Sequence, residues 1–113
     1  MNNEHVFPIV TREIAEKRAS LAPEAIEAFR SFSKTVFKEG ELSEKTKQLI
    51  AIAVAHVTQC PYCIRGHTAQ ALRKGASQEE IMEAIWVASE MRAGAAYAHS
   101  ALAIDEMAKT QQS

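Results

Sequence analysis

Eight consecutive residues gather the side chains of this chain that are best suited to chemistry. The segment Cys60-Pro61-Tyr62-Cys63-Ile64-Arg65-Gly66-His67 contains both cysteines of the 113-residue chain. Proline is tolerated at the first position of a helix, so Pro61 predicts a helix start and places Cys60 at the N-cap or in the first turn. The unpaired backbone N–H groups at that end of a helix stabilise a thiolate, which makes Cys60 a candidate reactive cysteine.

His67 lies four residues after Cys63 and therefore shares a helix face with it and with Cys60. An imidazole titrates near neutral pH, so it can accept the proton of a thiol and return it later in a cycle. The sequence therefore predicts a catalytic dithiol, Cys60 and Cys63, with His67 as its base.

The rest of the chain has the pattern of helices separated by short helix-ending segments. It shows almost none of the apolar–polar alternation that is typical of β-strands. Thr11 is a candidate cap, Pro23 a helix start, Gly75 a helix stop, and Ser77 with Glu80 a capping box. The sequence predicts an all-α single domain over residues 1–113 with about six helices. They are expected at 11–20, 23–40, 43–59, 61–74, from 77 onward, and 93–109.

Apolar side chains identify the expected core. The helix before the dithiol is expected to be mostly buried, through an apolar run that includes Leu49, Ile50, Ile52, Val54 and Val57. The helix that begins near Ser77 is expected to bury a further set: Ile81, Met82, Ile85, Trp86, Ala88 and, near its end, Met91.

Three segments together resemble a known family. They are the run from Leu42 to Ala55, the Cys-X-X-Cys followed three residues later by His67, and the segment Ala84–Ala88. This pattern resembles the carboxymuconolactone decarboxylase family, and within it the alkylhydroperoxidase D-like branch, over about residues 41–107. The resemblance implies an all-helical fold, a peroxide-reducing or disulfide-exchanging dithiol, and a homo-oligomer, either a trimer or a hexamer.

One position departs from the pattern of that branch. A glutamate usually lies twelve residues before the first cysteine and feeds a proton relay through the histidine to the second cysteine, whereas this chain has Gln48 there. An amide forms hydrogen bonds, but it cannot carry a proton through a relay at neutral pH as a carboxylate can. Glu44 and His56, on the same helix face, are candidates to substitute in the relay, and Tyr62 either covers the site or donates a hydrogen bond to substrate.

The order in which the thiols act stays open. The resemblance implies that Cys63 is the thiol under the control of the relay, while the helix position favours Cys60 as the more acidic thiol. An external dithiol or a reducing partner protein is expected to reopen the disulfide, and no cofactor is expected. The substrate is expected to be a peroxide or a small disulfide.

The composition of the chain argues against several classes of binding partner and location. A net charge of −1 without a basic cluster argues against nucleic acid or an anionic membrane as a partner. The N-terminus lacks the pattern of a signal peptide, and the longest apolar run is too short to span a bilayer, so a cytoplasmic location is expected. In a reducing compartment, a Cys-X-X-Cys is more often catalytic or metal-binding than a permanent crosslink.

Two alternatives remain open at this stage. His56, Cys60, Cys63 and His67 have the ligand types of a structural zinc site, although His67 lies on the same helix as the cysteines. The family name also suggests a decarboxylase or a related lactone enzyme. Such members do not depend on a dithiol, so the intact Cys-X-X-Cys favours redox chemistry.

Overall fold

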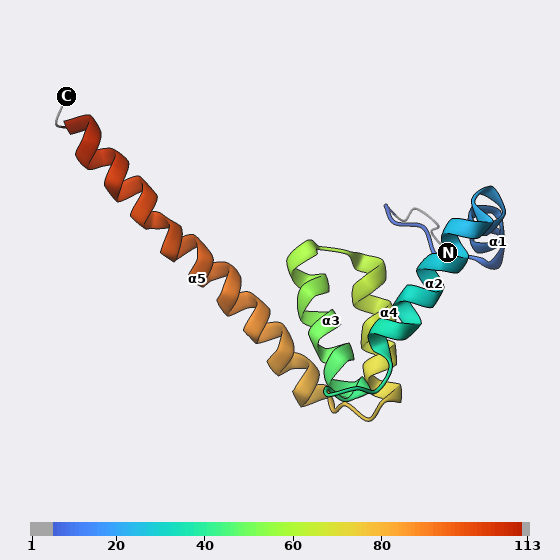
Figure 1. The fold of residues 1–113 in the computed structure, drawn as a ribbon. Coiled ribbons are helices and arrows are strands. Elements are labelled where there is room, and N and C mark those ends of the chain that lie inside the picture. The colour runs from blue at the N-terminus through green and yellow to red at the C-terminus, as the bar shows by residue number, and fades with distance from the viewer. Residues whose placement is uncertain (1–5, 112–113) are drawn as a thin grey trace. The chain divides into compact units, whose positions relative to one another are not determined.

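The structure is a computed structural model that describes residues 6–111, and every regular element in that range is a helix. The helices are α1 (Arg12–Leu21), α2 (Pro23–Phe37), α3 (Glu44–Thr58), α4 (Pro61–Arg73) and α5 (Gln78–Gln111), as Figure 1 shows. The predicted all-α fold is confirmed. None of the helices between residues 6 and 111 combines the length and the apolar character needed to cross a membrane.

The chain divides into two compact units, one up to Glu44 and the other from Lys45 onward. The first unit contains α1 and α2. The Thr11 hydroxyl accepts a hydrogen bond from the Ile14 N–H at 3.3 Å, and Pro23 occupies the start of α2, so both predicted helix starts are correct. Proline is well suited to this first helical position because its backbone φ angle is fixed at a value that a helix requires.

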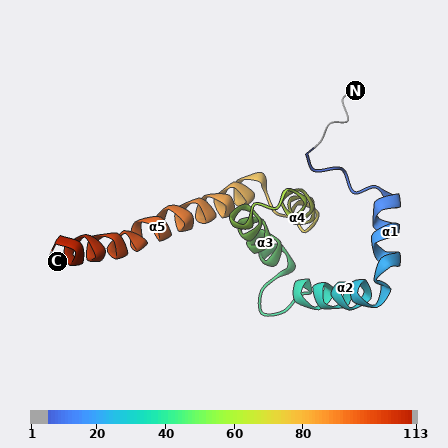
Figure 2. The ribbon, with the colours of Figure 1, turned by 90° about the horizontal axis from the view of Figure 1, so that it is seen from above.

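The second unit contains α3, α4 and α5, and both views show α3 and α4 side by side (Figures 1 and 2). Four buried residues form the core between these elements, and two partly buried side chains pack against them. These are Ile52, Ala71, Ala76 and Ile81, with Leu49 and Ile85. Ile52 is fully buried, and burial of such a side chain stabilises a fold by about 1.5–3 kcal/mol.

A glycine-dependent cap ends α4, as predicted. Gly75 has a φ of 90°, in the left-handed region that other residues rarely adopt. The Ala76 N–H donates to the Ala71 carbonyl at 2.9 Å and the Gly75 N–H donates to the Leu72 carbonyl at 3.1 Å, which is the Schellman pattern. The reversal places Ala76 in the core.

The predicted capping box opens α5. The Glu80 N–H donates to the Ser77 hydroxyl at 3.0 Å, and the Ser77 N–H donates to the Glu80 carboxylate at 2.9 Å. Lys45, in the first turn of α3, donates to the same carboxylate at 3.0 Å. Glu80 therefore joins the start of α5 to the start of α3.

The segment expected to form two helices after Ser77 is instead one continuous helix. The predicted boundary near residue 93 does not occur, because alanine favours a helix and the single Gly94 costs only about 1 kcal/mol there. The described range therefore holds five helices rather than about six.

Several side chains predicted to be in the core are exposed in this chain. On α5, Trp86, Met82 and Met91 are 68%, 49% and 61% exposed, so their assignment to the core was wrong for the single chain. Only one side of α5 faces the core. That side carries Ile81 and Ala88, which are buried, and Ile85, which is partly buried. The rest of the helix surface, with its large apolar residues, is left uncovered.

The expectation of a mostly buried α3 was also too broad. Ile52 and Ala55 are buried, whereas Ile50, Val54 and Val57 are exposed. Only one face of a helix packs against the core. When the apolar residues of a run point to more than that face, some of them remain exposed.

The charge of Glu80 should make stability depend on pH. The hydrogen bond from the Ser77 N–H, followed by the one from Lys45, lowers the pKa of Glu80 below its usual value of 4.5. A carboxyl with a lowered pKa in the folded state adds stability above its unfolded pKa and loses it as the pH falls through the folded pKa. We therefore expect Glu80→Gln to lower the urea midpoint at about pH 7, and the difference from wild type to shrink at about pH 3.5.

The neighbouring Glu79→Gln is the matched control, because Glu79 is exposed and takes no part in the capping box of Ser77 and Glu80. It should change the urea midpoint little at either pH. An equal loss for both variants would contradict the assignment of this pH dependence to Glu80.

Candidate active site

Cys60 lies where α3 ends and α4 begins. The preceding residue, Gln59, has a φ of 58° and is the only non-glycine residue with a positive φ in the described part of the chain. The Cys60 N–H donates to the Ala55 carbonyl at 3.1 Å, the long-range bond of a Schellman cap. Gln59 thus occupies the position where glycine is usual, and the chain reverses direction immediately before the first cysteine.

The same cysteine caps the next helix. The Cys60 sulfur accepts a hydrogen bond from the Cys63 N–H at 3.2 Å, and the Cys60 carbonyl accepts the Ile64 N–H at 2.9 Å. Pro61 follows in the first helical position. The predicted N-cap location of Cys60 is correct, and it puts this sulfur at the positive end of α4.

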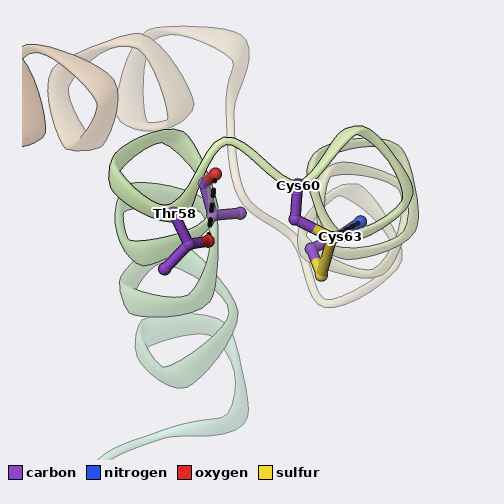
Figure 3. Close-up of a disulfide and its surroundings, with 4 residues drawn as sticks. Thr58, Cys60 and Cys63 are labelled. Carbon is purple, nitrogen blue, oxygen red and sulfur yellow. Dashed lines mark hydrogen bonds between the residues drawn. A yellow bond between two sulfur atoms is a disulfide. The ribbon is translucent and has the colours of Figure 1, made fainter.

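Cys60 and Cys63 are joined by a disulfide, with their Cα atoms 5.3 Å apart (Figure 3). Both residues are partly buried. In the chain-entropy account, a loop this short stabilises a fold by only about 2 kcal/mol, compared with about 3 kcal/mol for a loop of 15 residues. The crosslink therefore closes too small a loop to be a main source of stability.

His67 is held by Gln48 across the two helices. Its Nδ1 lies 2.7 Å from the Gln48 Oε1, although the residues are 19 positions apart in sequence. Gln48 is only 7% exposed and is the one buried polar residue among those that the structure describes. The position where the family branch has a glutamate thus touches the predicted base directly.

The remaining predicted site residues have other surroundings. His56 uses its Nδ1 in a 2.8 Å contact with the Ile52 carbonyl of its own helix. Tyr62, in the first turn of α4, is 43% exposed, and Glu44, in the first turn of α3, is partly buried. The structure therefore joins Cys60 with Cys63 and His67 with Gln48, while the ring of His56 contacts a carbonyl of its own helix.

The zinc-site alternative finds no support in this geometry. Within residues 6–111, no group of three or more histidine, cysteine, aspartate or glutamate side chains is arranged to hold a metal ion. His56 and His67 have their own hydrogen-bond partners, Ile52 and Gln48. The four candidate ligands are therefore not gathered into one site.

One contact near the dithiol was missed by sequence reasoning. Arg92 of α5 donates from Nη1 to the Val57 carbonyl at 3.0 Å, at the end of α3. A cation at the last carbonyls of a helix interacts favourably with the helix dipole. The two residues are 35 positions apart, so no local pattern could have identified the pair.

The chain is similar to a known protein family. The model of the carboxymuconolactone decarboxylase family matches residues 23–106. The chain belongs to this family. The match includes α2, α3, α4 and nearly all of α5, so it contains both cysteines, His67 and Gln48.

Proteins from several organisms are similar to this chain. A protein of uncharacterised function from the cox locus of Paracoccus denitrificans is 68% identical over 74 residues, 66% of this chain and 67% of that protein. A Methanobacterium thermoautotrophicum structure is 39% identical with a TM-score of 0.69, covering 75% of this chain and 94% of that one. A family member from Legionella pneumophila, solved in its apo form, is 35% identical with a TM-score of 0.67, covering 73% and 76%.

The left-handed conformation of Gln59 should be measurable as strain. A non-glycine residue in this conformation costs about 1–2 kcal/mol, and glycine removes that cost while making the unfolded chain more flexible. We expect Gln59→Gly to leave the free energy of unfolding unchanged or to raise it by up to about 1 kcal/mol, measured by urea denaturation of the oxidised protein.

Thr58→Gly is the matched control, because Thr58 is the last residue of α3 and has no positive φ. There, glycine should lower the free energy of unfolding by about 0.5–1 kcal/mol. If both variants destabilised the protein equally, the backbone strain assigned to Gln59 would be absent.

Proposed function

We propose that this protein is a thiol-dependent oxidoreductase that reduces peroxides through a dithiol–disulfide cycle of Cys60 and Cys63, with His67 as base. The observation that carries the proposal is the Cys60–Cys63 disulfide at the start of α4, where the Cys60 sulfur accepts the Cys63 N–H. A sulfur at this position is stabilised as a thiolate by the helix terminus once the disulfide is reduced.

The forward reaction needs no cofactor. A thiolate attacks one peroxide oxygen, the O–O bond breaks, and the cysteine becomes a sulfenic acid. The proton that the thiol lost goes to the departing oxygen, which leaves as water or an alcohol. The second thiol then attacks the sulfenic sulfur, an S–S bond forms, and the sulfenic oxygen leaves as water.

A reductant from outside must complete the cycle. An external dithiol or a reducing partner protein supplies two electrons and two protons and is itself left as a disulfide. Such a partner is plentiful in a reducing compartment, which is why we propose a cytoplasmic setting. Neither a nucleic acid nor a membrane enters this cycle.

A structural relative supports the redox assignment. A carboxymuconolactone decarboxylase family protein from Thermotoga maritima, for which a role in the antioxidative response has been suggested, is 28% identical with a TM-score of 0.55. It covers 77% of this chain and 96% of its own length. That suggestion concerns the relative, and it agrees with a dithiol that consumes oxidants.

The proposal is tested by the mass of the reduced protein before and after it meets one equivalent of an organic hydroperoxide. We expect a rapid loss of two hydrogens, matched by the peroxide consumed and reversed by a dithiol. Exchanging either cysteine for serine should abolish this loss. His67→Asn should slow peroxide consumption by about 10²–10⁴-fold if the imidazole transfers the proton.

His56→Asn is the matched control for that variant, because His56 is occupied by the Ile52 carbonyl. It should retain nearly the wild-type rate. Thiols that stay reduced in the wild-type protein would overturn the peroxidase proposal. A lactone conversion that survives alkylation of both cysteines would favour the decarboxylase alternative.

We also propose that the working form is a homo-oligomer of this chain, a trimer or a hexamer. Large apolar side chains on the second half of α5 are exposed in the single chain, including Tyr97 at 82% and Leu102 at 69%. Ile104 and Met107 continue this uncovered surface. Large apolar side chains that gather on an exposed surface are typical of a protein–protein contact, and further copies of the chain would supply the partner surface.

The oligomer is tested by the mass in solution from light scattering. The wild-type protein should have about three or six times the mass of one chain, as the family resemblance implies. Leu102→Glu should lower that mass, since a charge would be desolvated in the interface. Ser100→Glu, which alters a polar residue of the same segment, is the matched control for Leu102→Glu. A wild-type protein with the mass of one chain would contradict the proposal.

A further inference from the structure

Cys60 lies between the ends of two helices that carry opposite partial charges (Figure 3). Its N–H donates to the Ala55 carbonyl in the last turn of α3, and its sulfur accepts the Cys63 N–H in the first turn of α4. Aligned peptide dipoles make the N-terminus of a helix positive and its C-terminus negative. The start of α4 therefore stabilises a thiolate at Cys60, whereas the end of α3 opposes it.

Arg92 of α5 brings a positive charge to that unfavourable end. Its Nη1 donates to the Val57 carbonyl at 3.0 Å, three residues before Cys60 in the chain. The last four carbonyls of a helix have no N–H partner within their own helix. The Cys60 N–H pairs with one of them and the guanidinium with another, so a full positive charge lies where the negative partial charge of α3 collects.

A cap and a charge would have different effects on the two redox states. As a cap, Arg92 stabilises α3 equally whether the disulfide is open or closed, because its contact is with the Val57 carbonyl and not with a sulfur. As a charge, it stabilises the reduced protein more, because only the reduced protein carries a thiolate. The Arg92 side chain is exposed, so salt should weaken the effect of its charge.

We propose that Arg92 is a positioning residue for the dithiol, whose guanidinium offsets the negative end of α3 and thereby favours the thiolate of Cys60. The reduced protein is stabilised relative to the disulfide, which makes the disulfide a stronger oxidant. This inference rests on the proposed dithiol function and adds a residue of α5 to the control of the first cysteine.

The effect applies whichever thiol acts first. One thiolate attacks the peroxide oxygen, and the other thiol attacks the sulfenic sulfur that results. Cys60 is therefore a nucleophile in either order. A group that favours its thiolate assists the attack on peroxide in one order and the closure of the disulfide in the other.

The proposal is tested by the equilibrium between the oxidised protein and glutathione, measured as the fraction of protein whose thiols can be alkylated. The Cys60–Cys63 bond is opened by two electrons and two protons, and two glutathione molecules become one glutathione disulfide. Arg92→Met removes the charge and keeps an unbranched side chain, so it should lower the equilibrium constant for reduction by about two- to fivefold. An unchanged constant would overturn the proposal and leave Arg92 with the role of a cap alone.

Two further variants separate the charge from other effects. Arg92→Lys keeps the charge but loses the planar fork of donors, and it should stay within about 1.5-fold of wild type. A loss as large as that of Arg92→Met would contradict the proposal. Arg73→Met is the matched control, because it removes an exposed cation about 18 Å further along α4, beyond the Debye length of about 8 Å at physiological ionic strength. It should leave the constant unchanged, and a loss equal to that of Arg92→Met would also overturn the proposal.

Salt gives a readout that a purely structural role would not change. In about 1 M sodium chloride the Debye length falls to about 3 Å, so the difference between wild type and Arg92→Met should fall below about 1.5-fold. A difference that keeps its full size would contradict the electrostatic role. Because exchange with glutathione requires no peroxide, a protein that fails to reduce hydroperoxides can still pass or fail these tests independently.

Discussion

The reversal of the chain at Gln59 and Cys60 is the constraint on which the site depends. The N–H of Cys60 closes the cap of α3, while its sulfur and carbonyl open α4, so one residue serves both helices. Because α3 and α4 then run back along each other, Gln48 meets His67 from 19 positions away. A dithiol on a flexible loop would have neither its helix terminus nor its base in a fixed place.

Features of the second unit that depend on neighbouring residues could be predicted from the sequence, and features that depend on distant ones could not. Pro61, Gly75 and the pair of Ser77 with Glu80 act within one turn, and the structure confirms all three. The caps after α3 and α4 share the long hydrogen bond of a Schellman motif and a residue with positive φ, yet only Gly75 could be recognised from the sequence. Nothing about Gln59 indicates a left-handed backbone, because there the fold overrides local preference.

Burial was the least predictable property, and Gln48 and Trp86 show why. An amide would be expected outside and an indole inside, but Gln48 is 7% exposed and Trp86 is 68% exposed. Burying an unpaired polar group costs about 1–3 kcal/mol, and the bond to His67 offsets that cost for Gln48. Trp86 lies on a helix whose partners in this chain cover only one side, so its apolar character does not bring it into the core of the single chain.

The hydrogen bonds of the site do not depend on the disulfide, and this allows the site to keep its shape in both redox states. The Cys63 N–H already points at the Cys60 sulfur in the disulfide, so a thiolate formed there on reduction gains a stronger, charge-assisted hydrogen bond without a change in the backbone. The bond between His67 and Gln48 involves neither sulfur, so opening the disulfide does not break it. Little of the site needs to be rebuilt in either direction, because groups that are already in place would stabilise the charges that form.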